Sequence, residues 1–133
     1  MQKKSLKYYD KTYAQVLVLE REKTIAITWK GSINAKEYND TWKAVYLAAT
    51  EKSFRTVISD TRHGGVVPEE SKHWLLHTFA HQLAQAVRYI CVVVSENRNR
   101  ISFSDSVRKN TEGLFVFHYF DTLEEAKEWS LSC

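Results

Sequence analysis

The sequence predicts a single α/β domain built on a five-stranded, mostly parallel sheet. Short alternating or wholly apolar segments take turns with segments whose apolar residues recur every three to four positions. The first two strand-like segments follow one another closely enough for a hairpin, whereas the later ones are separated by helices, which is typical of parallel crossover connections. The chain of 133 residues, 44% hydrophobic and 26% charged, suits one core and contains neither linker nor repeat.

The opening hairpin is predicted from residues 13–19 and 24–29. The second of these segments alternates cleanly, with Ile25, Ile27 and Trp29 on one face and smaller residues on the other. Only four residues, 20–23, lie between the two segments, and this spacing favours a tight turn.

A first helix is expected after Gly31 and Ser32 interrupt the strand pattern. Asn34 and Glu37 have the spacing of a capping box, so the helix should begin at this point. Its buried face is expected to consist of Tyr38, Trp42, Val45, Tyr46 and Ala49.

Three further strands and three further helices complete the prediction. Residues 54–60, 88–94 and 114–120 are apolar enough for parallel strands, and the segment 88–94 should be central because both of its faces are apolar. Pro68 suits the first position of a second helix, whose buried face is expected to be Leu75, Leu76, Phe79, Leu83, Ala86 and Val87. A short helix is expected over residues 103–110, and Thr122 with Glu125 should cap a last one carrying Leu123, Ala126 and Trp129.

Composition and charge narrow the function classes. The net charge is only +3 and the basic residues are dispersed, which argues against a nucleic-acid binder. The basic residues at the start place residues 1–12 in a solvated extension of the single domain 1–133. No apolar run is long enough for a membrane span, and no secretory signal is recognisable. Cys91 in an apolar run and Cys133 suggest no disulfide framework, so a reducing, cytoplasmic setting is expected.

The predicted order of elements resembles the SpoIIAA-like (STAS-like) domain family, in particular its small stand-alone bacterial members. The local sequences that carry the resemblance are Thr-Trp-Lys-Gly-Ser at 28–32, Val-Ile-Ser-Asp-Thr-Arg at 57–62, Val-Val-Pro-Glu-Glu-Ser-Lys-His-Trp at 66–74 and Phe-Asp-Thr-Leu-Glu-Glu-Ala-Lys-Glu-Trp at 120–129. They span nearly the whole chain from Tyr13 to Trp129, and they identify a fold rather than a chemistry. The resemblance implies a non-enzymatic regulatory module that binds a protein partner.

The resemblance also implies a phosphorylation site. In anti-sigma-factor antagonists of this fold, a Ser or Thr that follows an Asp is phosphorylated at the start of the helix after the third strand. Thr61 after Asp60 stands in the matching place, although six residues, 62–67, separate Thr61 from the expected helix start. The alternative is that Asp60 and Thr61 simply cap the loop through bonds to the backbone.

A ligand site is the alternative to partner binding. Ligands of such sheets tend to bind at the carboxyl ends of the parallel strands. The residues expected there are Asp60, Thr61, Arg62, His63, Gly64, Gly65 and Arg98. Arginines and free amides could hold a small anionic group, and fold analogy adds a lipidic ligand. The two glycines permit either a close backbone approach or a positive φ.

Two more features on the second helix have competing interpretations. Trp74 either covers the glycine loop or serves as an exposed anchor for a partner. His73, His77 and His81 are spaced like metal ligands, but a solvated stripe is the simpler interpretation, so no metal or other cofactor is expected. No GxSxG elbow supports hydrolysis, so an enzyme is not expected. A homodimer is left open.

Overall fold

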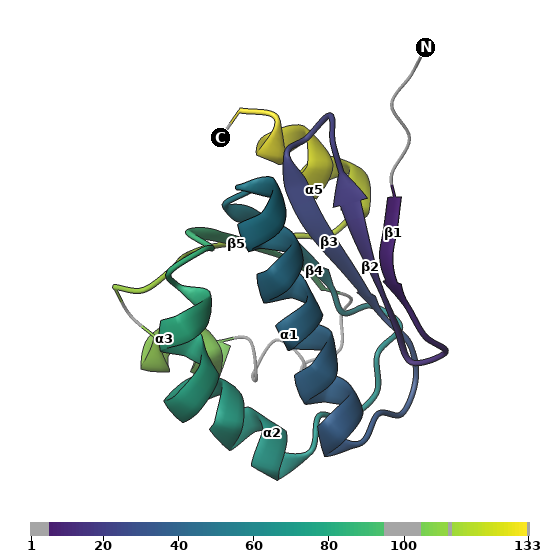
Figure 1. The fold of residues 1–133 in the computed structure, drawn as a ribbon, viewed down its shortest axis with the longest axis vertical. Helices are drawn as coiled ribbons and strands as arrows, with labels where there is room; N and C mark the ends of the chain where they lie inside the picture. The colour runs from purple at the N-terminus through teal and green to yellow at the C-terminus, as the bar shows by residue number, and fades with distance from the viewer. Residues whose placement is uncertain (1–5, 95–104, 112, 133) are drawn as a thin grey trace.

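The computed structural model describes residues 6–94, 105–111 and 113–132 (Figure 1). Its centre is a six-stranded sheet in which the strands lie in sequence order from β1 to β6. The first three strands are antiparallel and the pairs from β3 to β6 are parallel. The strands are β1 (Leu6–Asp10), β2 (Ala14–Leu19), β3 (Thr24–Trp29), β4 (Thr56–Asp60), β5 (Tyr89–Val93) and β6 (Val116–Phe120).

The α/β class and the opening hairpin agree with the sequence, but the strand number does not. Residues 6–10, expected to lie in a solvated extension, form an additional strand, β1. This strand pairs with β2 through a register that is irregular between Lys7 and Tyr9. This strand is paired on one side only and is largely exposed. It therefore lacks the apolar alternation by which a half-buried strand is recognised.

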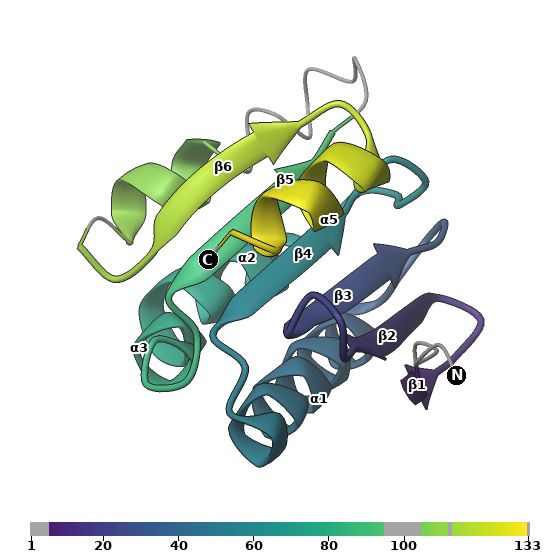
Figure 2. The ribbon, with the colours of Figure 1, turned by 90° about the horizontal axis from the view of Figure 1, so that it is seen from above.

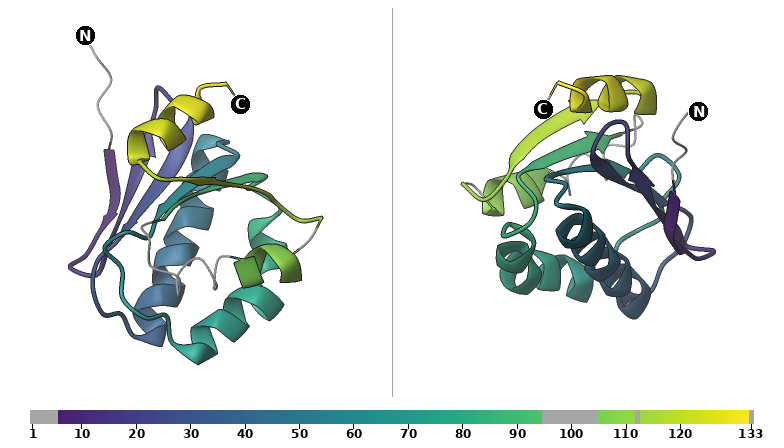
Figure 3. Two further views of the ribbon diagram at one scale, coloured as in Figure 1. Left: turned by 180° about the vertical axis from the view of Figure 1, so that it is seen from behind. Right: turned by 45° about the horizontal axis from the view of Figure 1, so that its top comes forward.

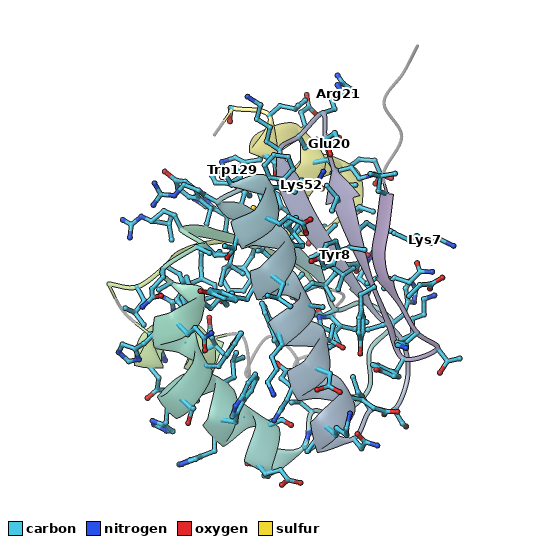
Figure 4. The ribbon with its side chains drawn as sticks, viewed as in Figure 1. Lys7, Tyr8, Glu20, Arg21, Lys52 and Trp129 are labelled. Atoms are coloured by element: carbon cyan, nitrogen blue, oxygen red, sulfur yellow. The ribbon has the colours of Figure 1, made fainter. Side chains whose placement is uncertain are left out.

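Helix α1 (Ala35–Lys52) begins where its capping box predicts. The Asn34 side chain accepts a hydrogen bond from the Glu37 amide at 2.8 Å, and the Glu37 carboxylate accepts one from the Asn34 amide at 3.0 Å. At the other end, Lys52 forms an ion pair with Glu20 at 3.0 Å, which joins the end of the helix to the β2–β3 turn (Figure 4). The expected buried face is confirmed, except that Tyr46 is half-buried.

The second helix is interrupted by a π turn. It runs through α2 (Glu69–Trp74), the π-helical η1 (Leu75–Phe79) and α3 (Ala80–Leu83). Pro68 caps it instead of occupying its first position. The residue inserted by the π turn rotates the face that follows it, so that Ala80 is buried while Leu76 and Ala86, expected to be buried, are half-buried. Ser71, which precedes the turn, is buried as well.

The sheet separates two unequal layers. Helix α1 and the α2–η1–α3 helix cover one face, and α5 (Leu123–Ser130), capped by Thr122 as predicted, covers the other (Figures 2 and 3). A helical segment at residues 105–110 contributes Val107 to the core of the first face. That core is the larger one, whereas the core under α5 centres on Ile58, Cys91 and Ala126. Among the described residues, no helix has the length and apolar character that crossing a membrane requires.

Candidate functional site

A cavity of about 240 Å³ lies within the larger core, between the sheet and the helices. From the sheet it is lined by the side chains that point toward α1, namely Trp29, Ser59, Ile90, Val92 and Phe117. These residues come from four adjacent parallel strands. Because the order of the described strands never reverses, this sheet has no switch-point crevice, and the hollow forms under the helices instead.

The helices and one loop complete the wall. The helical residues that line the cavity are Tyr38, Trp42, Lys72, Leu75, Ala80, Leu83 and Val107. Phe115, Thr61 and the segment Gly64, Gly65, Val66 and Val67 are the other described residues that line the cavity. Val66 is 83% exposed although it lines the cavity, which places the opening to solvent at the loop after β4.

One part of the wall is aromatic. The rings of Trp29 and Tyr38 are stacked with centroids 4.9 Å apart, and the Trp42 ring lies 6.1 Å from that of Trp29. All three residues are buried. We call Trp29, Tyr38 and Trp42 the aromatic wall.

Most polar groups near the cavity already have partners. The Trp29 indole N–H donates to Ser59 Oγ at 3.0 Å, and the Thr61 hydroxyl donates to the Val93 carbonyl at 2.9 Å. Lys72, the one charged side chain among the described residues that line the cavity, pairs with the exposed Glu69 at 3.1 Å. A ligand in the cavity therefore meets few polar groups that lack a hydrogen-bond partner.

The Trp42 indole N–H is the exception. Trp42 is only 5% exposed, and its indole nitrogen is shielded from solvent. This N–H has no hydrogen-bond partner among the described residues. Burial raises the pKa of the adjacent Tyr38 phenol, and the neighbouring Trp42 N–H acts in the opposite direction. The two groups do not, however, meet the geometry of a hydrogen bond. A donor of this kind is rare in a folded interior.

The loop after β4 is held to β3 by backbone contacts between glycines. The Gly31 amide donates to the His63 carbonyl at 2.8 Å, and the Gly65 amide donates to the Gly31 carbonyl at 2.7 Å. A Cβ at Gly65 would lie 2.7 Å from the Gly31 carbonyl oxygen, so Gly65 serves close approach and not a positive φ. This contact sets the position of the cavity's outer side.

The remaining residues of the expected ligand loop lie apart from the cavity. Asp60 is buried and accepts hydrogen bonds from Arg62 Nε at 2.9 Å and Arg62 Nη2 at 2.8 Å, and this contact raises the pKa of the guanidinium. Asp60, Arg62 and the exposed His63 are not among the lining residues, whereas Thr61, Gly64 and Gly65 are. Arg98 lies outside the described residues.

The phosphorylation and partner-binding hypotheses remain predictions. The Thr61 amide and hydroxyl both bond to the Val93 carbonyl, and the next helix begins only at Glu69.

Trp74 is half-buried and stacks on Phe79 with centroids 4.6 Å apart, while the Lys43 ammonium lies over its ring. Its indole is thus largely engaged within the fold.

The histidine stripe is on the outside of the second helix. His73, His77 and His81 are all exposed, and the first two rings lie 4.4 Å apart. Within residues 6–94, 105–111 and 113–132, no group of three or more histidine, cysteine or acidic side chains is arranged to hold a metal ion.

The cavity itself was not foreseen from the sequence. The sequence pattern places Tyr38 and Trp42 on a helix face and Trp29 on a strand face, and each of these patterns is also that of an ordinary core residue. The local density of large aromatic residues was the available signal. No protein-family model, curated protein or solved structure matched this chain.

Proposed function

We propose that this protein binds a small, mainly apolar ligand in the cavity between the sheet and the helices. The observation that carries the proposal is a cavity of about 240 Å³ walled mainly by aromatic and aliphatic side chains. Protein interiors are normally packed with few voids larger than a water molecule. A cavity that opens to solvent beside Val66 and is walled mainly by apolar side chains is therefore a candidate ligand site.

The volume also limits the size of the ligand. An apolar cavity of about 150 Å³ accommodates benzene, so this one suits a compact molecule of about ten non-hydrogen atoms. A long acyl chain would extend past Val66 into solvent. A bicyclic or substituted aromatic compound fits better, because it can lie against the aromatic wall and gain favourable ring contacts.

The proposal assigns binding to the site and not catalysis. The hydroxyls of Ser59 and Thr61 lie at the cavity but are hydrogen-bonded to Trp29 and to the Val93 carbonyl, and Lys72 is paired with Glu69, so these groups are engaged within the protein. Of the two sequence-based hypotheses, ligand binding is favoured over partner binding, because the loop after β4 contributes Thr61, Gly64 and Gly65 to an apolar pocket. The SpoIIAA-like resemblance is not needed for this argument.

Thermal unfolding with small probes tests the proposal. The probes are α-methylstyrene, ethylbenzene and indole, each added near its solubility limit. A probe that binds only the folded state raises stability by about 1.4 kcal/mol at ten times its Kd. We expect at least one probe to raise the Tm, and calorimetric titration to give one site per chain.

A cavity-filling variant with a matched control locates the binding. Ala80→Leu places three more carbon atoms in the cavity, since Ala80 is 1% exposed and lines it. Ala84→Leu makes the same change one turn further along, at a half-buried residue that is not among those that line the cavity. Probe affinity should fall at least tenfold in Ala80→Leu and stay unchanged in Ala84→Leu. Absence of binding by every probe, or equal binding by both variants, would refute the proposal.

A further inference from the structure

We infer that the ligand carries a carbonyl oxygen, and that the Trp42 indole N–H recognises it. The inference rests on the proposed function and deepens it. Its basis is that Trp42 lines the cavity and holds a buried donor without a partner among the described residues. An indole N–H that is excluded from water in this way loses its hydrogen bond on folding, and a bound acceptor would restore it.

The contrast with Trp29 shows why the donor at Trp42 is informative. Both indoles belong to the aromatic wall and both are at least nine-tenths buried. The Trp29 N–H is satisfied within the protein by Ser59 Oγ at 3.0 Å, so it needs nothing from a ligand. The Trp42 N–H has no acceptor among the described residues, so a molecule in the cavity that reaches it can supply one.

The chemistry of the donor also selects the kind of oxygen. An indole N–H can only donate, so its partner must accept. A carbonyl brings acceptor lone pairs and no hydrogen of its own, and it therefore satisfies Trp42 without adding a donor that would need a further partner. Combined with the volume, this points to a compact aromatic ketone, aldehyde or related carbonyl compound of about ten non-hydrogen atoms.

The test uses two probes of nearly the same shape. Acetophenone and α-methylstyrene differ by a carbonyl oxygen in place of a methylene group, so the first can accept a hydrogen bond and the second cannot. In the ¹⁵N-labelled wild-type protein, the Trp42 indole cross-peak, assigned by its loss in Trp42→Phe, should move downfield with acetophenone and much less with α-methylstyrene. The shift is measured in the wild-type protein, and Trp42→Phe serves only to assign the cross-peak.

The affinities of the two probes give a second readout. The ratio of the acetophenone Kd to the α-methylstyrene Kd is compared among wild type, Trp42→Phe and Trp29→Phe, so that the difference in their transfer from water cancels. We expect the ratio to rise about tenfold in Trp42→Phe, since the buried carbonyl then loses its donor. The ratio should not rise in Trp29→Phe, because the N–H of the wild-type Trp29 already donates to Ser59 and is not needed by the ligand.

The outcomes separate this inference from the proposed function. Suppose that both probes bind the wild type and that Ala80→Leu weakens their binding, but that the Trp42 cross-peak does not move and the ratio is unchanged. The cavity is then a ligand site and the inference is wrong. It is equally wrong if Tyr38→Phe, and not Trp42→Phe, raises the ratio, since the hydroxyl would then be the group that recognises the oxygen. If neither probe binds the wild type, the inference fails, and if ethylbenzene and indole also do not bind, the proposed function fails with it.

Discussion

Replacing Gly65 by alanine should weaken the fold through a single backbone contact. The added Cβ would stand 2.7 Å from the Gly31 carbonyl oxygen, 3.0 Å from the Gly31 carbonyl carbon and 3.2 Å from Ser32 Cα. All three atoms belong to the backbone, so no side-chain rotation can relieve the clash. The loop and the residues after β3 must separate by about 0.7 Å to reach the ordinary contact distance of 3.4 Å.

The expected size of the effect follows from the two hydrogen bonds that join these segments. They are the bonds of 2.7 and 2.8 Å in which Gly31 accepts from Gly65 and donates to His63. Their loss costs about 1 kcal/mol each, and the lower entropy of the unfolded alanine chain offsets about 0.4–1 kcal/mol. The net loss of about 1–2 kcal/mol lowers the Tm of a chain of this length by about 4–7 °C.

Calorimetry, together with hydrogen exchange at Gly31, measures this effect. A matched control is Gly31→Asn, because Gly31 has a φ of +61° and open space around a Cβ, and asparagine tolerates that conformation at a cost of less than about 1 kcal/mol. Gly65→Ala should also weaken probe binding, because Gly65 lines the cavity. An unchanged Tm together with full protection of the Gly31 amide would refute the reasoning.

Two further predictions concern the aromatic wall. Ser59→Ala should destabilise the protein by about 1–3 kcal/mol in urea unfolding, because it leaves the buried Trp29 N–H without its acceptor. Ser59→Thr keeps the hydroxyl and should lose less stability, and equal losses in the two variants would contradict this explanation. Burial raises the pKa of Tyr38 above its ordinary value of 10.0, so above that pH the unfolded state releases the proton first and stability falls by up to about 1.4 kcal/mol per pH unit. Unfolding free energies at pH 7–11 should therefore fall less steeply for Tyr38→Phe than for wild type, and parallel curves would speak against the assignment.

Periodicity predicted the elements in which one face is buried and missed those in which burial has another pattern. Strand β1 was missed because it is an edge strand and largely exposed, so Leu6 and Tyr8 provide no contrast between two faces. The π turn was missed because a 3.6-residue period cannot reveal one inserted residue. Ala80 was consequently left out of the expected buried face, although it is 1% exposed and lines the cavity.

The ligand site was predicted in part, through its loop. A glycine pair after a strand indicates either a close approach or a turn, and the structure decides for close approach at Gly65. Asp60 and Arg62 were read as groups for a ligand, but they satisfy one another, and a contact between two side chains leaves no periodic trace in a sequence. The empty volume itself depends on how four strands and several helices meet, which no single segment encodes.

The strictly sequential order of the strands has a consequence for how the chain folds during synthesis. Each strand from β2 to β6 pairs with the strand that precedes it in the chain, so its partner has already left the ribosome when it emerges. No described strand has to wait for a later one to be inserted beside it. The exposed edge consequently advances by one strand at a time, from the β1–β2 hairpin to β6. We expect nascent chains ending after β4 already to protect the hairpin from proteolysis.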